Sequence, residues 1–218
     1  MSISQLNESQ KAAVMYNEGP SLVIAGAGSG KTRVLTYKIT YLLEVVGLKP
    51  YQIMALTFTN KAAREMKDRI AQMVGPEKAQ YLAMGTFHAQ FSKLLRTESA
   101  HIGLPSNFTV YDTADAKNLI KAIVKEMQLD EKTYKPSVVL SRISSAKNKM
   151  VMPQQYDDAN GRSLDFMMRI PKVKEIYTEY QRRLKQAGAM DFDDMLCLTN
   201  QLFIQHPEVL EKYQNRFQ

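Results

Sequence analysis

One glycine-rich stretch constrains the fold of this chain more than any other feature. The stretch Gly26-Ala27-Gly28-Ser29-Gly30-Lys31-Thr32 follows a short apolar run, Ser21–Ala25. The run is typical of a buried strand, and the apolar spacing from Leu35 to Val46 after it predicts an amphipathic helix. A second apolar run, Ile53–Phe58, follows that helix. Strand, helix and strand in this order predict a βαβ unit with a parallel sheet and a right-handed crossover.

A glycine-rich loop between a strand and a helix can hold the phosphates of a nucleoside triphosphate. Glycines permit a tight turn that aims successive N–H groups at phosphate oxygens, and the helix N-terminus adds its dipole. Lys31 would reach the β- and γ-phosphates, and the Thr32 hydroxyl would ligate Mg²⁺. The pattern G-x-x-x-x-G-K-[ST] departs at Ala25, where glycine is usual. The expected nucleotide-binding residues of the loop are Gly26, Ala27, Gly28, Ser29, Gly30, Lys31 and Thr32, with ATP and Mg²⁺ as cofactors.

Two residues beside the loop favour adenine as the base. The amide of Gln10, which lies in Leu6-Asn7-Glu8-Ser9-Gln10, can pair with both the donor and the acceptor edge of adenine. Arg33 directly follows Thr32, and its planar guanidinium can stack on the base.

The rest of the chain predicts an α/β domain with a helical insertion. A helix capped by Thr59 or Asn60 precedes a third strand candidate, Tyr81–Phe87, and from Pro105 to about Gly188 the pattern is mostly helical. Within that part, Thr113 is expected to cap a helix, and 142–165 is expected to be rich in loops. A later helix is expected to place Val173, Ile176, Tyr177, Tyr180 and Leu184 on one face.

Polar and aromatic residues follow two of the predicted strands and suit a single-stranded nucleic acid. Thr57-Phe58-Thr59-Asn60-Lys61 and Gly85-Thr86-Phe87-His88 each combine a ring with small polar groups. Open α/β sheets bind ligands at the carboxyl ends of their strands, and aromatic stacking holds single strands without sequence preference. Either phenylalanine could instead belong to the core. The candidates for nucleic-acid contact are Phe58, Thr59, Asn60, Thr86 and His88.

Composition and charge exclude several classes of protein. The net charge of +7 is compatible with a polyanionic partner, and Cys197 as the one cysteine excludes an internal disulfide framework. The histidines, His88, His101 and His206, are scattered in the sequence, so no zinc cluster is expected. The chain has neither a long apolar run nor the layout of a signal peptide, so we expect a cytoplasmic protein without a membrane partner.

Together these stretches resemble the UvrD/PcrA/Rep-type superfamily 1 DNA helicases. The resemblance rests on LNESQ (6–10), AGAGSGKTR (25–33), ALTFTNKAAREMKDR (55–69), GTFHAQFSKLLR (85–96) and DFDDML (191–196). That family commonly has alanine at the position of Ala25. It implies a RecA-like P-loop NTPase domain with a parallel sheet and an inserted all-α subdomain.

By the same resemblance, residues 1–106 would be the first part of the ATP-binding domain, 107–188 the helical insertion, and 189–218 the return to the first domain. Gln10 and Arg33 would contact adenine, and the five candidates above would line the track for single-stranded DNA. Arg142, Lys147 and Lys149 would contact duplex phosphates, or would form a solvated basic helix face.

The resemblance also indicates what this chain lacks. The family's hydrolytic carboxylates follow an apolar strand, whereas Asp130-Glu131 lies in polar sequence and Asp191, Asp193 and Asp194 lie at a helix start. We therefore expect the N-terminal piece of an ATP-dependent helicase that moves 3′ to 5′ on single-stranded DNA, in repair or replication. A second RecA-like half would follow in the parent chain, and substrates would include junctions of single- and double-stranded DNA.

The piece alone would bind nucleotide and DNA weakly and would not hydrolyse ATP. The alternatives are a non-catalytic, nucleotide-gated module that binds single-stranded DNA, and a RecB-like helicase-nuclease relative. A P-loop kinase of small molecules is disfavoured because it would leave the TFTNK and GTFH segments without a role.

Overall fold

The computed structural model describes residues 3–218, which form two compact units. The first unit comprises the residues up to 90 together with 211–218, and the second comprises 91–210. The divisions fall within α5 (Phe87–Thr97) and within α12 (Pro207–Arg216). The helical insertion expected from the sequence, 107–188, has different bounds from either compact unit. It stays a prediction, because a division by compactness does not test whether a segment is inserted into a domain.

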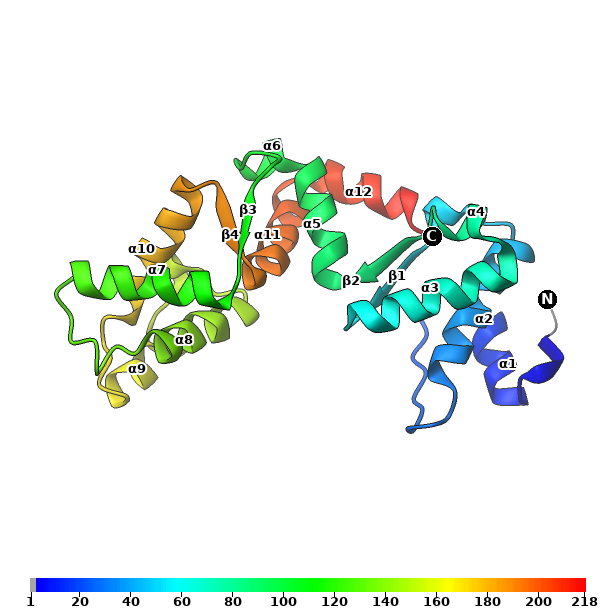
Figure 1. The fold of residues 1–218 in the computed structure, drawn as a ribbon, viewed down its shortest axis with the longest axis horizontal. Helices are drawn as coiled ribbons and strands as arrows, with labels where there is room; N and C mark the ends of the chain where they lie inside the picture. Colours follow the sequence, from blue (N-terminus) through cyan, green and yellow to red (C-terminus); the bar gives the residue numbers. More distant parts are fainter. Residues whose placement is uncertain (1–2) are drawn as a thin grey trace. The chain divides into compact units, whose positions relative to one another are not determined.

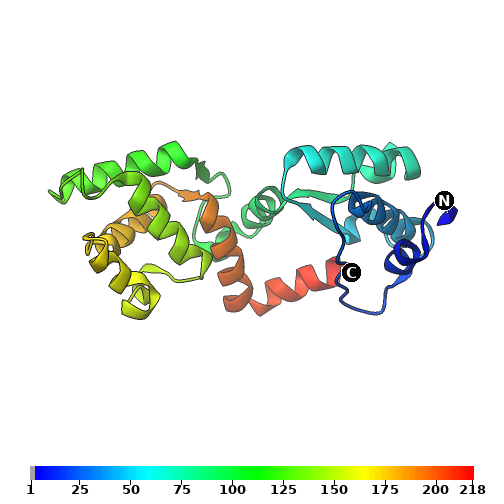
Figure 2. The ribbon, with the colours of Figure 1, turned by 90° about the horizontal axis from the view of Figure 1, so that it is seen from below.

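The first unit is built on a small parallel sheet. β1 (Met54–Thr57) pairs with β2 (Ala83–Thr86), so that Thr57 lies opposite Thr86. The connecting helix α3 (Asn60–Val74) runs along one face of both strands (Figure 1; Figure 2). The other elements of this unit are η1 (Ile3–Gln5), α1 (Glu8–Met15), α2 (Lys31–Glu44), η2 (Pro50–Gln52) and α4 (Pro76–Ala79). The parallel βαβ unit is therefore formed by β1, α3 and β2.

The expected strand at Ser21–Ala25 is wrong. This segment has no strand hydrogen bonds, and the side chains of Leu22 and Ile24 are 85% and 90% exposed. A strand that is apolar on both faces needs neighbouring strands and a packed layer on each side. Within residues 3–218, β1 pairs only with β2, and the apolar run joins neither strand.

Helix α3 shows how local sequence signals fix an element of this unit. The side chain of Thr59 caps its N-terminus by accepting a hydrogen bond from the N–H of Ala62 at 3.1 Å. At the other end Gly75 has a φ of 92°, which favours glycine, and Pro76 begins α4. Ala63, Met66 and Ile70 are buried, as their helical spacing predicts.

The second unit is mainly helical. Besides its helices it contains a short parallel pair of strands, β3 (Thr109–Tyr111) and β4 (Ala189–Asp191). The helices and helical turns are α6 (Ser99–Ile102), α7 (Thr113–Glu126), α8 (Pro136–Asn148), η3 (Pro153–Gln155), η4 (Asp158–Arg162), α9 (Ser163–Met167), α10 (Val173–Gln186) and α11 (Phe192–Gln205). Its core joins α7, α8 and α10, and the apolar face predicted for α10 is buried in full.

Two local predictions for this unit are corrected. Asp112, and not Thr113, caps α7, because its carboxylate accepts hydrogen bonds from the N–H groups of Ala114 and Asp115 at 2.7 and 2.9 Å. The segment expected to be loop-rich begins too early, since Arg142 lies in the middle of α8. Among the described residues, no helix combines the length and apolar character needed to cross a membrane.

Candidate functional site

The glycine-rich loop leads directly into α2. Gly28 and Gly30 have φ values of 75° and 84°, which L side chains rarely adopt, and Gly30 is the N-cap of the helix. A Cβ on Gly30 would lie only 3.1 Å from Nε2 of Gln10, so this position is restricted by space as well as by conformation. The turn therefore requires glycine where it meets the first turn of α2.

Lys31 and Ser29 fold back onto the loop. Nζ of Lys31 donates hydrogen bonds to the carbonyls of Ala25 at 3.0 Å and Gly26 at 2.8 Å. The Ser29 hydroxyl also donates to Gly26, at 2.8 Å. The ammonium group is thus held at the N-terminus of a 14-residue helix, where the positive end of the helix dipole also lies. Both features favour an anionic group at this point.

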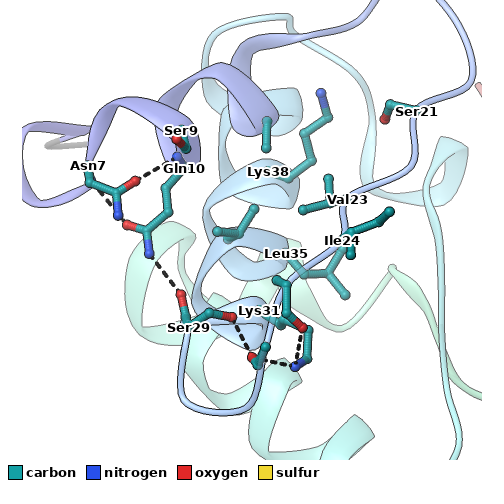
Figure 3. A pocket seen from close by; sticks show the side chains of 14 residues that line it. Asn7, Ser9, Gln10, Ser21, Val23, Ile24, Ser29, Lys31, Leu35 and Lys38 are labelled. Atoms are coloured by element: carbon teal, nitrogen blue, oxygen red, sulfur yellow. Dashed lines mark hydrogen bonds between the residues drawn. The ribbon is translucent and has the colours of Figure 1, made fainter.

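Gln10 reaches the loop from α1. Its side chain forms a capping box with Asn7, and its Nε2 donates to the carbonyl of Ser29 at 3.0 Å (Figure 3). A cavity of about 630 Å³ lies beside these groups, within the usual size range of small-molecule sites. Its lining joins polar and charged groups of Asn7, Gln10, Ser29, Lys31 and Lys38 to the apolar side chains of Val23, Ile24, Val34 and Leu35.

The structure brings only some of the predicted nucleotide-binding residues to this cavity. Gln10, Gly26, Ser29 and Lys31 line it, whereas Ala27, Gly28, Gly30, Thr32 and Arg33 do not. Arg33 donates from Nη2 to Oε1 of Gln5 at 3.2 Å and lies 5.7 Å from the ring centroid of Tyr37. Thr32 is exposed in the first turn of α2. Lys38 also lines the cavity, although no sequence motif points to it, and burial lowers its pKa.

The loop and cavity fit a nucleoside triphosphate by the chemistry of their donors. A cation, two residues with left-handed backbone and a helix N-terminus suit phosphate oxygens. The amide of Gln10 and the apolar lining suit a base. The hydroxyl of Thr32, which is a hard oxygen donor, suits Mg²⁺ as a ligand. None of the cavity-lining residues is acidic.

The residues predicted to contact nucleic acid lie at the carboxyl ends of β1 and β2. Phe58 follows β1 and is 93% exposed, and its ring centroid lies 5.9 Å from that of Phe87, which follows β2. The parallel register with Thr57 opposite Thr86 explains why the two rings meet. The reading of Phe58 as a core residue is therefore wrong.

The neighbouring polar candidates are partly used by local structure. The hydroxyls of Thr59 and Thr86 accept from the N–H groups of Ala62 and Ala89 at 3.1 and 3.2 Å. Asn60 is exposed in the first turn of α3, and His88 is half-buried in the first turn of α5. All five candidates thus lie where the neighbouring strands β1 and β2 end and the helices α3 and α5 begin.

In the second unit, Lys147 has neither of the roles considered from the sequence. Its side chain is fully buried, and Nζ lies 2.7 Å from Asp191 and 2.8 Å from Asp194. The hydroxyl of Tyr180 also donates to Asp191, at 2.8 Å. Burial favours the neutral amine, but the two carboxylates outweigh it and raise the pKa of Lys147. Lys147 is therefore a structural cation.

The two carboxylates around Lys147 respond differently to burial. Burial opposes ionisation of both, yet the charge of Lys147 outweighs it at Asp191 and lowers the pKa of that carboxyl. At Asp194 burial dominates, the negative charge of Asp191 adds to it, and the pKa is raised. One ammonium facing two carboxylates explains the difference.

Arg142 is likewise engaged inside the second unit. Its Nε donates to Asp165 at 2.7 Å and its Nη2 to the carbonyl of Gly161 at 3.1 Å. Lys149, in contrast, is exposed at the C-terminus of α8. The sequence did hold a signal for Lys147, because it continues the helical spacing of the buried residues Val139 and Ile143.

The histidines are scattered in the sequence, but the fold brings two of them together. The ring centroids of His101 and His206 are 4.6 Å apart in the second unit. His88 belongs to the first unit.

Comparison with known proteins covers nearly the whole chain. Residues 6–218 match the family described as the UvrD/REP helicase N-terminal domain. The chain is 44% identical over 216 residues to the ATP-dependent DNA helicase PcrA of Staphylococcus aureus strain Mu50 and to that of Staphylococcus epidermidis strain RP62A. These alignments include 99% of this chain and 29% of each relative, so the chain spans about three tenths of the relatives' length.

Proposed function

The chain belongs to the UvrD/REP helicase N-terminal domain family, and from this premise we propose that it is the ATP-binding N-terminal part of an ATP-dependent DNA helicase. The resemblance inferred from the sequence motifs is thereby confirmed at the level of the family. The observation that carries the proposal is the glycine-rich loop, which presents Lys31 and the N-terminus of α2 beside the cavity that Gln10 lines.

In this proposal Lys31 neutralises the β- and γ-phosphates, and the loop N–H groups bind their oxygens. Thr32 would ligate Mg²⁺, Gln10 would recognise the adenine edge, and Arg33 would pack on the base after leaving Gln5. Mg²⁺ would supply charge neutralisation and orientation of the phosphates when bound. The set Gly26–Gly30 provides the backbone of the loop.

The second part of the proposal concerns DNA. Phe58 and Phe87 offer exposed and half-exposed rings at one sheet edge, and Thr59, Asn60, Thr86 and His88 surround them with polar groups. Such an edge suits the stacked bases and phosphates of single-stranded DNA, including the single-stranded side of a junction. In the parent protein the translocation would run 3′ to 5′, in the cytoplasm, with a second RecA-like half completing the site.

We further propose that residues 1–106 and 189–218 belong to the RecA-like domain and that 107–188 is its helical insertion. Three of the acidic groups considered for hydrolysis are engaged in other contacts. Asp191 and Asp194 hold Lys147, and Asp130 accepts from the N–H of Thr133 at 2.9 Å. We therefore expect weak nucleotide binding without hydrolysis by these 218 residues.

Nucleotide binding by the 218-residue chain tests this function. Titration with a fluorescent ATP analogue in the presence of Mg²⁺ should give saturable binding that Lys31→Ala weakens at least about tenfold, since a charge-assisted hydrogen bond to phosphate is lost. Arg64→Ala, which removes an exposed cation of α3, is the matched control and should bind like the unaltered chain. Equal affinities of the Lys31→Ala variant and the unaltered chain would overturn the assignment. Normal ATP turnover by the whole helicase carrying Lys31→Ala would overturn it as well.

A further inference from the structure

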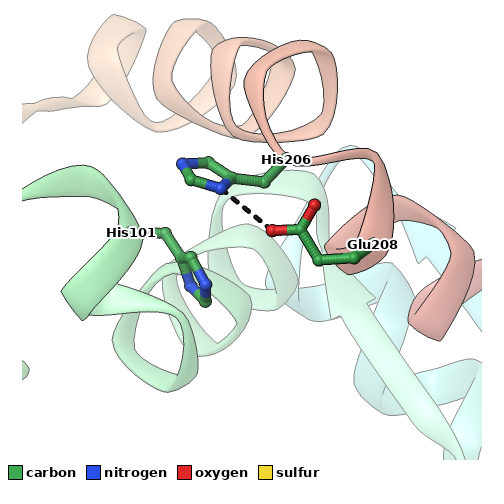
Figure 4. Close-up of side chains that lie close together, drawn as sticks. All are labelled: His101, His206 and Glu208. Carbon is green, nitrogen blue, oxygen red and sulfur yellow. Dashed lines mark hydrogen bonds and ion pairs between the residues drawn. The ribbon is translucent and has the colours of Figure 1, made fainter.

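Three side chains with metal-binding chemistry meet in the second unit. One imidazole nitrogen each of His101 and His206 and one carboxylate oxygen of Glu208 all lie within 4.8 Å of one another (Figure 4). The two rings meet edge-on, with an interplanar angle of 63°. Nδ1 of His206 lies 3.0 Å from Oε1 of Glu208.

The backbone holds these residues in place. The N–H of His206 donates to Leu202 at 2.9 Å, and its carbonyl accepts from Val209 at 3.0 Å, so the residue is fixed between α11 and α12. Pro207 begins α12 directly after it, and the fixed φ of proline restricts the backbone between His206 and Glu208. His101 lies in α6, and its N–H donates to the carbonyl of Glu98 at 2.9 Å.

The charges around the cluster favour a cation. The carboxylate of Glu98, whose side chain is nearly buried, lies 3.6 Å from Nδ1 of His101. The side chain of Glu208 is 65% exposed, and its Oε1 lies 3.0 Å from Nδ1 of His206. It adds a second carboxylate to the surroundings of the two imidazoles.

We propose that His101, His206 and Glu208 bind a divalent transition-metal ion of the Zn²⁺ type. Two imidazoles and one carboxylate are ligands that Zn²⁺ accepts, and a tetrahedral ion with bonds of about 2.0–2.1 Å would leave its fourth position to water. In that geometry the ligand atoms lie about 3.3 Å apart. Small side-chain rotations therefore suffice to bring the three atoms from within 4.8 Å to bonding positions.

The site is separate from the Mg²⁺ that the proposed function requires. Mg²⁺ prefers six oxygen ligands in octahedral geometry, so a cluster with two ring nitrogens selects against it. A bound ion would tie α6 to the junction of α11 and α12 and would stabilise the folded second unit, because it binds the folded arrangement and not the separated side chains. Glu98 would orient His101 as a neighbouring carboxylate commonly does for metal-bound histidine.

Calorimetric titration of the untagged 218-residue chain with ZnCl₂, without nucleotide, tests the proposal. We expect one Zn²⁺ per chain and an affinity that falls at least about tenfold in each of His101→Ala, His206→Ala and Glu208→Gln. Excess MgCl₂ should not compete. Thermal unfolding in EDTA and in ZnCl₂ reports the same site independently, with a Zn²⁺-dependent rise of the midpoint that the three variants lose.

Two matched controls separate this site from other ligands on the surface. His88→Ala removes the histidine outside the cluster, and Glu211→Gln removes an exposed carboxylate further along α12. Both should bind Zn²⁺ like the unaltered chain. The proposal is overturned if the chain does not bind Zn²⁺, or if the cluster variants bind it as tightly as the controls. Circular dichroism in EDTA establishes that each variant is folded, and Glu208→Gln leaves the backbone and side-chain size unchanged.

Discussion

At the residue scale, Lys147 shows how a buried charge can be tolerated when every partner is present. Its ammonium, the two carboxylates and the Tyr180 hydroxyl form one connected cluster in the second unit. A buried ion pair adds little net stability, but the loss of one partner leaves the others unpaired at high cost. The importance of such a cluster for stability therefore becomes measurable when one of its members is removed.

Lys147→Met should destabilise the second unit by about 3–5 kcal/mol at pH 7, because it leaves two buried carboxylates without a cation. Urea unfolding measures the change, with Lys121→Met on the exposed face of α7 as control. The control should remain within about 0.5 kcal/mol of the unaltered chain.

The same variant should respond to pH in a defined direction. Without Lys147, burial and mutual repulsion raise the folded-state pKa values of Asp191 and Asp194 above the unfolded value of about 3.9. The folded state then binds more protons than the unfolded state, so stability falls as pH rises through these raised values. The deficit of Lys147→Met should therefore be smaller at pH 5 than at pH 7. A deficit that is equal at both would contradict this account of the cluster.

Phe58 is the residue on which the proposed DNA edge most depends. Its ring is 93% exposed beside Phe87. Phe58→Ala should weaken binding of an oligothymidine by about 1–3 kcal/mol, the usual contribution of stacking one base on an aromatic ring. Fluorescence anisotropy measures the affinity. Tyr81→Ala removes an exposed ring before the amino end of β2 and should have no effect, so equal losses in both variants would place DNA elsewhere.

At the element scale, the start of α7 is set by a capping box. The Asp112 carboxylate accepts from two N–H groups of the first turn, and the Asp115 carboxylate accepts from the N–H of Asp112 at 3.2 Å. The helix then contributes Ile120 and Ile123 to the core of the second unit. Loss of the cap therefore acts on a helix that cannot unfold without exposing the core.

Asp112→Ala should lower the free energy of unfolding by about 1 kcal/mol, within the usual range for an N-cap. Asp112→Ser keeps an acceptor oxygen and should recover most of the loss. Urea unfolding followed by circular dichroism compares the variants. Equal stability of the alanine variant and the unaltered chain would show that solvent replaces the cap without cost.

At the scale of the whole molecule, charge matters more than any one contact for the proposed DNA partner. The chain has a net charge of +7, and exposed cations such as Lys61 and Arg64 lie in α3, directly after Phe58 and Thr59. Lys61 is only loosely paired, since its Nζ lies 3.9 Å from Glu65. Such exposed pairs exchange readily for phosphate contacts.

Binding of single-stranded DNA should therefore weaken with salt. The slope of log affinity against log salt concentration should be about −1.4 or steeper, which corresponds to two or more neutralised phosphates at about −0.7 each. Anisotropy titrations over a series of KCl concentrations measure it. Lys61→Ala should reduce the slope by about one phosphate, and a slope near zero would contradict an electrostatic contribution from the chain.

Local sequence by itself determined most of the elements and the kind of loop that precedes α2. The cap at Thr59, the buried face of α10 and the glycines at Gly28 and Gly30 follow from interactions within a few residues. The same short stretches identified the family, because they carry its motifs as continuous sequence. The strands at 53–58 and 81–87 were likewise predicted, although β1 and β2 are shorter.

Only the tertiary structure decided which distant residues meet. Ser21–Ala25 has the composition of a strand but pairs with none. The sequence alone suggests that Lys147 is a basic surface residue, whereas the fold places two carboxylates beside it. His101 and His206 come together although the sequence separates them widely. Helix caps and apolar spacing act along the chain, whereas strand pairing, buried charge clusters and ligand sets depend on neighbours brought in from elsewhere by packing.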